Sequence, residues 1–192
     1  MSMLVVVSIV LVLMIVWIIA VYNKLIRMIE EVNNNKQQID VQLDRRFKVY
    51  ESLIEVVKKY MDYEKTTLKD VVALRSQAQK ANQAGDEKGR MVAEDAISKL
   101  GANINLLFEQ YPDLKANQNA MQLQEEIVST ENKLAFSKQA YNDSIEKYNA
   151  KRKSFFESVV AGMFGTKLLK DFMYWGISEE QRTKQEEYKV KL

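Results

Sequence analysis

The chain has 192 residues, and 47% of them are apolar, which suits one folded domain with a core. Its 28 basic and 26 acidic residues leave a formal net charge of +2, so no general attraction for nucleic acid is expected. Cysteine and histidine are both absent. This excludes disulfides, zinc and haem sites with those ligands, carboxylate–histidine di-iron sites, and Ser-His or Cys-His nucleophiles.

Turn-forming residues are rare, because the sequence contains six glycines and one proline. Strands joined by tight turns need many more of them, so this composition indicates an all-α fold. The glycines also do not have the spacing of a phosphate-binding loop. We therefore predict a protein that is not an enzyme and that has no cofactor, no catalytic residues and no metal site.

The first predicted element is the apolar run at residues 3–21, in which Ser8 is the single polar residue. At 1.5 Å per residue, a helix of this length nearly spans a hydrocarbon core of roughly 30 Å. No basic residue precedes the run and no small-residue cleavage site follows it, which favours an anchor over a signal peptide. We assign residues 1–22 to a transmembrane anchor, with Met3, Leu4, Val5, Trp17, Val21 and Tyr22 as anchor residues.

The orientation of the anchor is predicted from its flanks. Trp17 and Tyr22 lie near one end, as interfacial aromatic residues do, and Lys24 and Arg27 follow directly. The positive-inside rule then places the rest of the chain in the cytoplasm. The predicted location is the cell (inner) membrane, crossed once, with the lipid bilayer as a partner.

Residues 23–154 are predicted to form a bundle of long helices. Apolar residues recur at spacings of three and four between Leu43 and Val71, with one turn skipped at Glu64. Because no glycine or proline interrupts residues 22–82, we expect the anchor to continue into this region as one unbroken helix. The next stop is expected at Gly85 to Gly89.

Two further helices follow the same pattern. The second is predicted from Ala93 to Tyr111 and ends before Pro112, because the residue before a proline disfavours the helical conformation. The third is predicted from Ala120 to Tyr148. Long helices joined by short turns predict an elongated antiparallel bundle of three to four long helices that continues from the transmembrane helix. Thr130 and Ser137 within its seam indicate either a buried polar layer that fixes register or a ligand site.

Residues 155–177 form a second apolar stretch, which contains Glu157, Lys167, Lys170 and Asp171 and is therefore too charged to cross a membrane. We predict an amphipathic C-terminal helix here, followed by a charged tail at residues 178–192. Three alternatives stay open, namely a helix in the membrane interface, a fourth helix packed on the bundle, or a contact with a neighbouring copy. The candidate contact residues are Phe155, Phe156, Phe164, Leu168, Leu169, Phe172, Tyr174 and Trp175.

Three segments, at residues 38–46, 111–117 and 123–132, resemble signature stretches of the LemA family of bacterial membrane proteins. The resemblance covers roughly residues 22–165 and places the aromatic segment near Trp175 and the tail beyond the shared region. The signature positions are Asp40, Gln42, Arg46, Tyr111, Pro112, Asp113, Asn117, Glu131 and Asn132. The turn around Pro112 has a physical explanation of its own, with Asn117 as the N-cap of the next helix, but a loop there is also suited to docking a partner.

The resemblance implies a single N-terminal anchor followed by a long-helix bundle, with no established enzymatic activity. The favoured hypothesis is a membrane-anchored scaffold that forms a homo-oligomer and organises or shapes the bilayer. The alternative is a monomeric tethered adaptor that presents its bundle to a protein partner such as a protease, a channel or a signalling protein. No nucleic-acid partner is expected.

Overall fold

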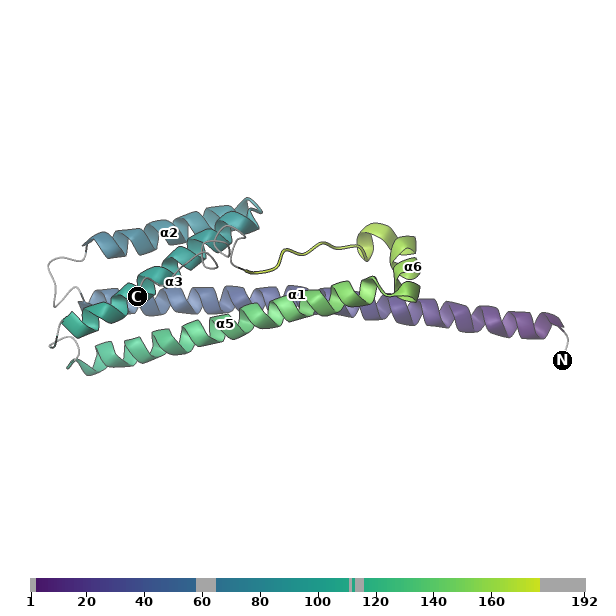
Figure 1. Ribbon diagram of the computed structural model, residues 1–192, viewed down its shortest axis with the longest axis horizontal. Helices are drawn as coiled ribbons and strands as arrows, with labels where there is room; N and C mark the ends of the chain where they lie inside the picture. Colours follow the sequence, from purple (N-terminus) through teal and green to yellow (C-terminus); the bar gives the residue numbers. More distant parts are fainter. Residues whose placement is uncertain (1–2, 58–64, 111, 113–115, 177–192) are drawn as a thin grey trace, which may run out of the picture. The chain divides into compact units, whose positions relative to one another are not determined.

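The computed structural model describes residues 3–57, 65–110, 112 and 116–176 (Figure 1). All regular elements of this part are helical, as predicted. They are α1 (Met3–Val57), α2 (Lys65–Gln83), α3 (Glu87–Gln110), α5 (Gln118–Arg152), α6 (Phe155–Phe164) and a short 3₁₀ helix, η1 (Gly165–Lys167). Glu64, Tyr111, Asp113 and the predicted tail at 178–192 lie outside the described residues.

The chain divides into two compact units. Unit 1 comprises Met1–Val41 and Phe136–Tyr174, and unit 2 comprises Gln42–Ala135 and Trp175–Leu192. Helices α1 and α5 contribute to both units. The long N-terminal apolar helix thus continues directly into the bundle, which confirms the predicted fold class.

In unit 1, α1 and α5 pack through buried residues at helical spacing. Leu25, Val32 and Ile39 of α1 are fully buried at intervals of seven, which keeps them on one face. On α5 the buried residues are Tyr141, Ile145 and Tyr148. The side-chain amide of Asn35 donates a hydrogen bond to the carbonyl of Ala140 at 3.2 Å, so these two positions lie opposite one another.

In unit 2, four helices surround one apolar core (Figure 1). Partly buried side chains such as Leu74 of α2 pack against this core. The core itself is formed by buried residues of α1, α3 and α5, which are Val49, Tyr50, Leu53, Ile97, Ala120 and Ile127. Burying one apolar side chain of this size contributes on the order of 1.5–3 kcal/mol. This core is the reason why the helices pack as a bundle.

The expectation of one unbroken helix over residues 22–82 is wrong. The guanidinium of Arg75 lies 3.2 Å from the carboxylate of Asp44 and 3.5 Å from the ring centroid of Phe47. In a single helix, residues 44 and 75 would be separated by about 46 Å. Instead α1 ends at Val57 and a second helix, α2, begins at Lys65, and the skipped apolar turn at Glu64 was the one sequence signal for a break.

The predicted break at Gly85 to Gly89 and the predicted cap of the third helix at Asn117 are both confirmed. One detail differs, because Gly89 belongs to α3 and not to the break. Gly85 has a φ of +72° and follows the end of α2, and the Asp86 carboxylate accepts a hydrogen bond at 2.8 Å from the amide of Gly89, which is already inside α3. Asn117 caps α5 as predicted, because its side-chain oxygen accepts a hydrogen bond at 3.1 Å from the amide of Ala120.

The predicted helix over residues 155–177 is too long, because α6 ends at Phe164. Gly165 follows with a φ of +46°, which side-chain-bearing residues rarely adopt, and its amide bonds to the carbonyl of Ala161. After η1, residues 168–176 continue without helix. Their backbone groups are held instead by side chains of α5, as described below.

Two alanine substitutions should separate the backbone effects at these glycines. We expect Gly165→Ala to destabilise the end of α6 by about 1–3 kcal/mol, because the positive φ becomes strained. Gly162→Ala should stabilise α6 by about 0.5–1 kcal/mol, because it lies inside the helix and open space surrounds its Cβ position. Hydrogen exchange of the α6 amides would measure both, and the same sign for both variants would contradict the assignment.

Candidate functional site

Of the helices in the described ranges, α1 is the one that is long and apolar enough to cross a membrane. Its residues from Met3 to Ala20 are exposed except for the half-buried Ile18, and Met3 and Leu4 are 84% and 79% exposed. The first buried residue is Val21. Four of the predicted anchor residues, Met3, Leu4, Val5 and Trp17, therefore lie on an exposed apolar helical surface, whereas Val21 is buried and Tyr22 is half-buried.

Helix α6 lies beside the end of this apolar surface (Figure 1). The rings of Trp17 and Phe156 are 6.0 Å apart in an edge-to-face arrangement, and those of Tyr22 and Phe164 are 4.7 Å apart. Phe155 stacks edge-on against Phe156 at 5.1 Å. We call Trp17, Tyr22, Phe155, Phe156 and Phe164 the aromatic cluster.

Both faces of α6 are apolar, and one of them is uncovered. Val160 and Ala161 are buried, so this side of the helix packs on the protein. The other side carries large exposed side chains: Phe155, Phe156, Val159 and Met163. Phe155 alone is 79% exposed. This apolar surface is continuous with the anchor through the aromatic cluster.

An ion pair connects the first turn of α6 to α5. The ammonium group of Lys151, in the last turn of α5, contacts the carboxylate of Glu157. The hydrogen bond between Lys151 and Glu157, together with the positive charge of Lys24 on α1, holds the pKa of Glu157 below its usual value. The ion pair thus connects α5 and α6, and Lys24 lies close enough to act on it.

The segment after η1 is tied to α5 by side chains that bond its backbone. The Tyr148 hydroxyl donates to the carbonyl of Leu168 and accepts a hydrogen bond at 2.9 Å from the amide of Lys170. Arg152 donates to the carbonyl of Lys170 at 2.6 Å and pairs with Asp171 at 2.8 Å. These bonds fix the C-terminal end of α6 relative to α5.

The structure divides the eight predicted contact residues into two groups. Leu168 and Trp175 are buried, and Phe172 is half-buried with its ring 5.6 Å from that of Tyr148. These three pack on the protein. The exposed group consists of Phe155, Phe156, Phe164, Leu169 and Tyr174. Sequence reasoning missed Val159 and Met163, whose place on the exposed face depends on where α6 begins.

In unit 2, a buried arginine joins three helices. Arg46 of α1 is 1% exposed, and one terminal nitrogen of its guanidinium contacts the carboxylate of Glu94 on α3. The other donates to the Ser98 hydroxyl at 2.6 Å and to the carboxylate of Glu131 on α5 at 3.4 Å. We call Arg46, Tyr50, Glu94, Ser98 and Glu131 the Arg46 layer.

The remaining bonds of the Arg46 layer converge on Glu131. The hydroxyls of Tyr50 and Ser98 donate to its two carboxylate oxygens at 3.1 Å and 3.3 Å. Burial, together with the negative charge of Glu131, raises the pKa of Tyr50 far above its usual value of 10.0. Tyr50 is therefore a neutral donor at physiological pH, and the carboxylate is held by donors from two other helices.

The layer has the character of a structural ion network. Both terminal guanidinium nitrogens are occupied by protein groups, and a buried network of this kind fixes the register of the helices that supply it. The layer is built from residues other than Thr130 and Ser137, the two seam residues that were predicted to mark a polar layer or a ligand site, and Thr130, next to Glu131, is fully buried. Ser137 is half-buried. Among the residues with a described position, no group of carboxylates could hold a metal ion.

Two of the predicted signature residues, Arg46 and Glu131, meet in this layer although they are 85 positions apart. Sequence reasoning did not predict that Tyr50, Glu94 and Ser98 belong to this layer. The spacing of apolar residues between Leu43 and Val71 placed Tyr50 on the buried face, but nothing in the sequence singled out Glu94 or Ser98. Gln42 is half-buried, Pro112 and Asn132 are exposed, and Asn117 caps α5. Asp40 is half-buried on α1 in unit 1.

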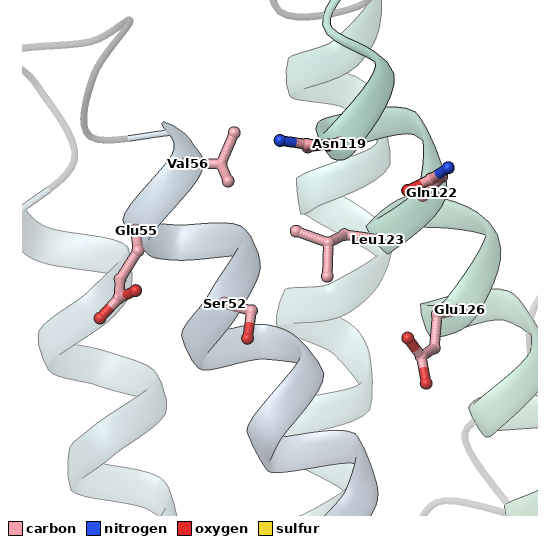
Figure 2. Close-up of a pocket in the computed structure, with 7 residues that line it drawn as sticks. All are labelled: Ser52, Glu55, Val56, Asn119, Gln122, Leu123 and Glu126. Carbon is pink, nitrogen blue, oxygen red and sulfur yellow. The ribbon is translucent and has the colours of Figure 1, made fainter.

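A groove of about 440 Å³ lies between the end of α1 and the start of α5 (Figure 2). It is lined by Ser52, Glu55, Val56, Asn119, Gln122, Leu123 and Glu126. Glu55 points away from α5, and Glu126 is paired with Arg45 at 2.9 Å (Figure 2). Acid–base catalysis by two carboxylates needs both groups on one substrate, and this pair does not converge.

These features define a class of protein: an all-α chain whose N-terminal helix can cross a membrane and continues into a bundle that is joined by a buried ion network. The comparisons with known proteins add the family. A family model described as the LemA family matches residues 35–191. The chain belongs to the LemA family.

A curated relative, Protein LemA from Metamycoplasma hominis, is 28% identical over 139 residues. The matched region covers 72% of this chain and 63% of the relative, so the chain spans less than two thirds of that protein's length. The family match also corrects the predicted extent of the resemblance. It begins at residue 35 and reaches residue 191, so the aromatic segment near Trp175 and the tail belong to the shared region.

Proposed function

We propose that this protein is a membrane-anchored, non-enzymatic scaffold that self-associates and organises or shapes the bilayer. The observation that carries the proposal is the continuity between the uncovered apolar surface of α1 and that of α6. Because the two apolar helices meet at the aromatic cluster, both could contact the same bilayer, with α1 crossing it and α6 lying in its interface. On this proposal the anchor crosses the inner membrane once, with the body on the cytoplasmic side.

An interfacial α6 would explain how the protein shapes the bilayer. A helix whose apolar face enters one leaflet acts on that leaflet alone, and its binding depends on curvature and lipid composition. The exposed face of α6 carries several large apolar side chains over ten residues. A network such as the Arg46 layer also suits a scaffold, because it keeps the helices in one register.

Self-association is supported by the surfaces that a second copy could cover. Gly162 is exposed on α6, and nothing lies within 4 Å of its Cβ position, so a neighbouring helix could approach closely. Copies joined head to tail would form rings or open helical assemblies. The alternative, a monomeric adaptor, would use its bundle surface for a protein partner, and the groove at Ser52 and Leu123 is one place that could receive it.

The mass of the full-length protein in mild detergent, with negative-stain images of the same sample, tests the choice. We expect large, regular particles. The double variant Phe155→Ser/Met163→Ser should reduce their size, whereas Met121→Ser, which changes an exposed side chain on α5, should not. A monodisperse monomer for the unmodified protein would contradict the scaffold and favour the adaptor.

A further inference from the structure

We propose that the basic side chains around α6 bind the headgroup phosphates of anionic phospholipids where α1 leaves the bilayer. This inference rests on the proposed function, because it takes α1 as the anchor and α6 as an interfacial helix. It adds the chemical class of lipid that the protein selects. The residues concerned are Lys24, Arg27, Lys153, Lys167 and Lys170, which we call the basic set.

The antiparallel pairing of α1 and α5 brings the basic set together. Asn35 lies opposite Ala140, and counting along both helices from this pair places Lys153 beside Tyr22. The same count places Tyr148 beside Arg27, and the Tyr148 hydroxyl holds the amide of Lys170 at 2.9 Å. Residues from three separate segments therefore reach the level of α1 between Tyr22 and Arg27.

That level matches the headgroup region of a bilayer. Tyr22 ends the apolar surface of the anchor, and Arg27 lies five residues further along α1, about 7.5 Å beyond it. The polar layer on each side of a hydrocarbon core is of similar thickness, roughly 5–8 Å. With the aromatic cluster at the edge of the hydrocarbon, Lys24 and Arg27 fall at the depth of lipid phosphates.

The basic set is available for a ligand. Its five side chains are exposed and form no ion pair with any other residue in the described part of the chain. The acidic groups nearest to them are already engaged, because Glu157 pairs with Lys151 and Asp171 pairs with Arg152. Glu30 and Glu31 follow on α1 one turn further from the apolar run. Positive charge therefore predominates next to the aromatic cluster.

Lipid selectivity can be measured with a single probe, because the sequence contains no cysteine. Met163→Cys, on the exposed face of α6, would be labelled with an environment-sensitive fluorophore, and the full-length protein would be reconstituted into phosphatidylcholine vesicles. Trace amounts of spin-labelled phosphatidylglycerol or spin-labelled phosphatidylcholine are then added in parallel. Quenching of the fluorophore reports which lipid collects beside α6.

We expect stronger quenching by spin-labelled phosphatidylglycerol, and high salt should reduce the difference because it screens exposed charges. Each basic residue near an anionic surface strengthens binding on the order of fivefold. The variant Lys153→Gln/Lys167→Gln/Lys170→Gln should therefore lose most of the preference. The control Lys80→Gln/Lys88→Gln/Lys99→Gln removes the same charge from exposed positions in unit 2 and should retain it.

The outcomes separate this inference from the proposed function. Equal quenching by both lipids, or a preference that survives the triple variant and high salt, would overturn the anionic-lipid site while leaving α6 at the membrane. The absence of quenching by either lipid would overturn both, because α6 would then not touch the bilayer. Preference for phosphatidylglycerol that disappears only in the basic-set variant supports both.

Discussion

Arg46→Leu is expected to lower the free energy of unfolding by about 3–5 kcal/mol, because it leaves buried carboxylates without their cation. Glu94 and Glu131 both contact this guanidinium, and Arg46 itself is 1% exposed. For a chain of this size, the loss corresponds to a fall in Tm on the order of 10 °C. Thermal unfolding of the full-length protein in detergent, followed by circular dichroism, would measure it.

The neighbouring residue provides the matched control. Arg45 pairs with Glu126 at 2.9 Å, but both side chains are more than 40% exposed, and such pairs contribute roughly 0–1 kcal/mol. Arg45→Leu should therefore change Tm little. Replacing Arg46, Glu94 and Glu131 together by leucine should recover much of the loss, because the unpaired charges are removed with the arginine. A similar effect for Arg45→Leu and Arg46→Leu would contradict the assignment of a buried network.

Leu168→Ala is expected to destabilise the segment that holds the end of α6 by about 2–5 kcal/mol. Leu168 is fully buried, and it follows η1 at the point where Tyr148 bonds the returning chain. Loss of this side chain leaves a cavity and frees the backbone bonds of residues 168–170. Hydrogen exchange of the amides from Leu168 to Met173 should accelerate by at least tenfold.

Leu169→Ala is the control for this variant, since the same side chain is removed one position away where it is 49% exposed. In Leu169→Ala, the amides from Leu168 to Met173 should exchange at nearly the same rate as in the unmodified protein. If the two variants accelerate exchange equally, the packing of Leu168 does not hold the segment.

Much of the fold could be predicted from the sequence because its helices are marked by strong local signals. The apolar run at residues 3–21 predicted a helix long and apolar enough to cross a membrane, and Asn117 caps the helix that the spacing predicted. The end of α1 at Val57 and the start of α2 at Lys65 were missed because no glycine or proline occurs between residues 22 and 82. The pairing of Arg75 with Asp44, which shows that α1 and α2 are separate helices, joins residues 31 positions apart and leaves no local pattern.

Parts of the candidate sites could also be predicted from local signals in the sequence. Contact residues on α6 follow from apolarity, but their division into exposed Phe155 and buried Leu168 depends on the helix ending at Gly165. The Arg46 layer could not be assembled from spacing, because Glu94 looked like any surface carboxylate of an amphipathic helix. Side chains that pair across helices 48 residues apart leave no local pattern.

Cysteine accessibility in native membranes tests the central claim most directly, namely that α6 and α1 contact the same bilayer. Single cysteines would replace Phe155, Val159 and Met163 on α6, with Phe136→Cys on α5 as the control because Phe136 is 71% exposed. We predict that a charged, membrane-impermeant maleimide labels position 136 readily and labels the three α6 positions only after detergent dissolves the membrane. Labelling of the α6 positions as fast as position 136 in intact membranes would contradict the account.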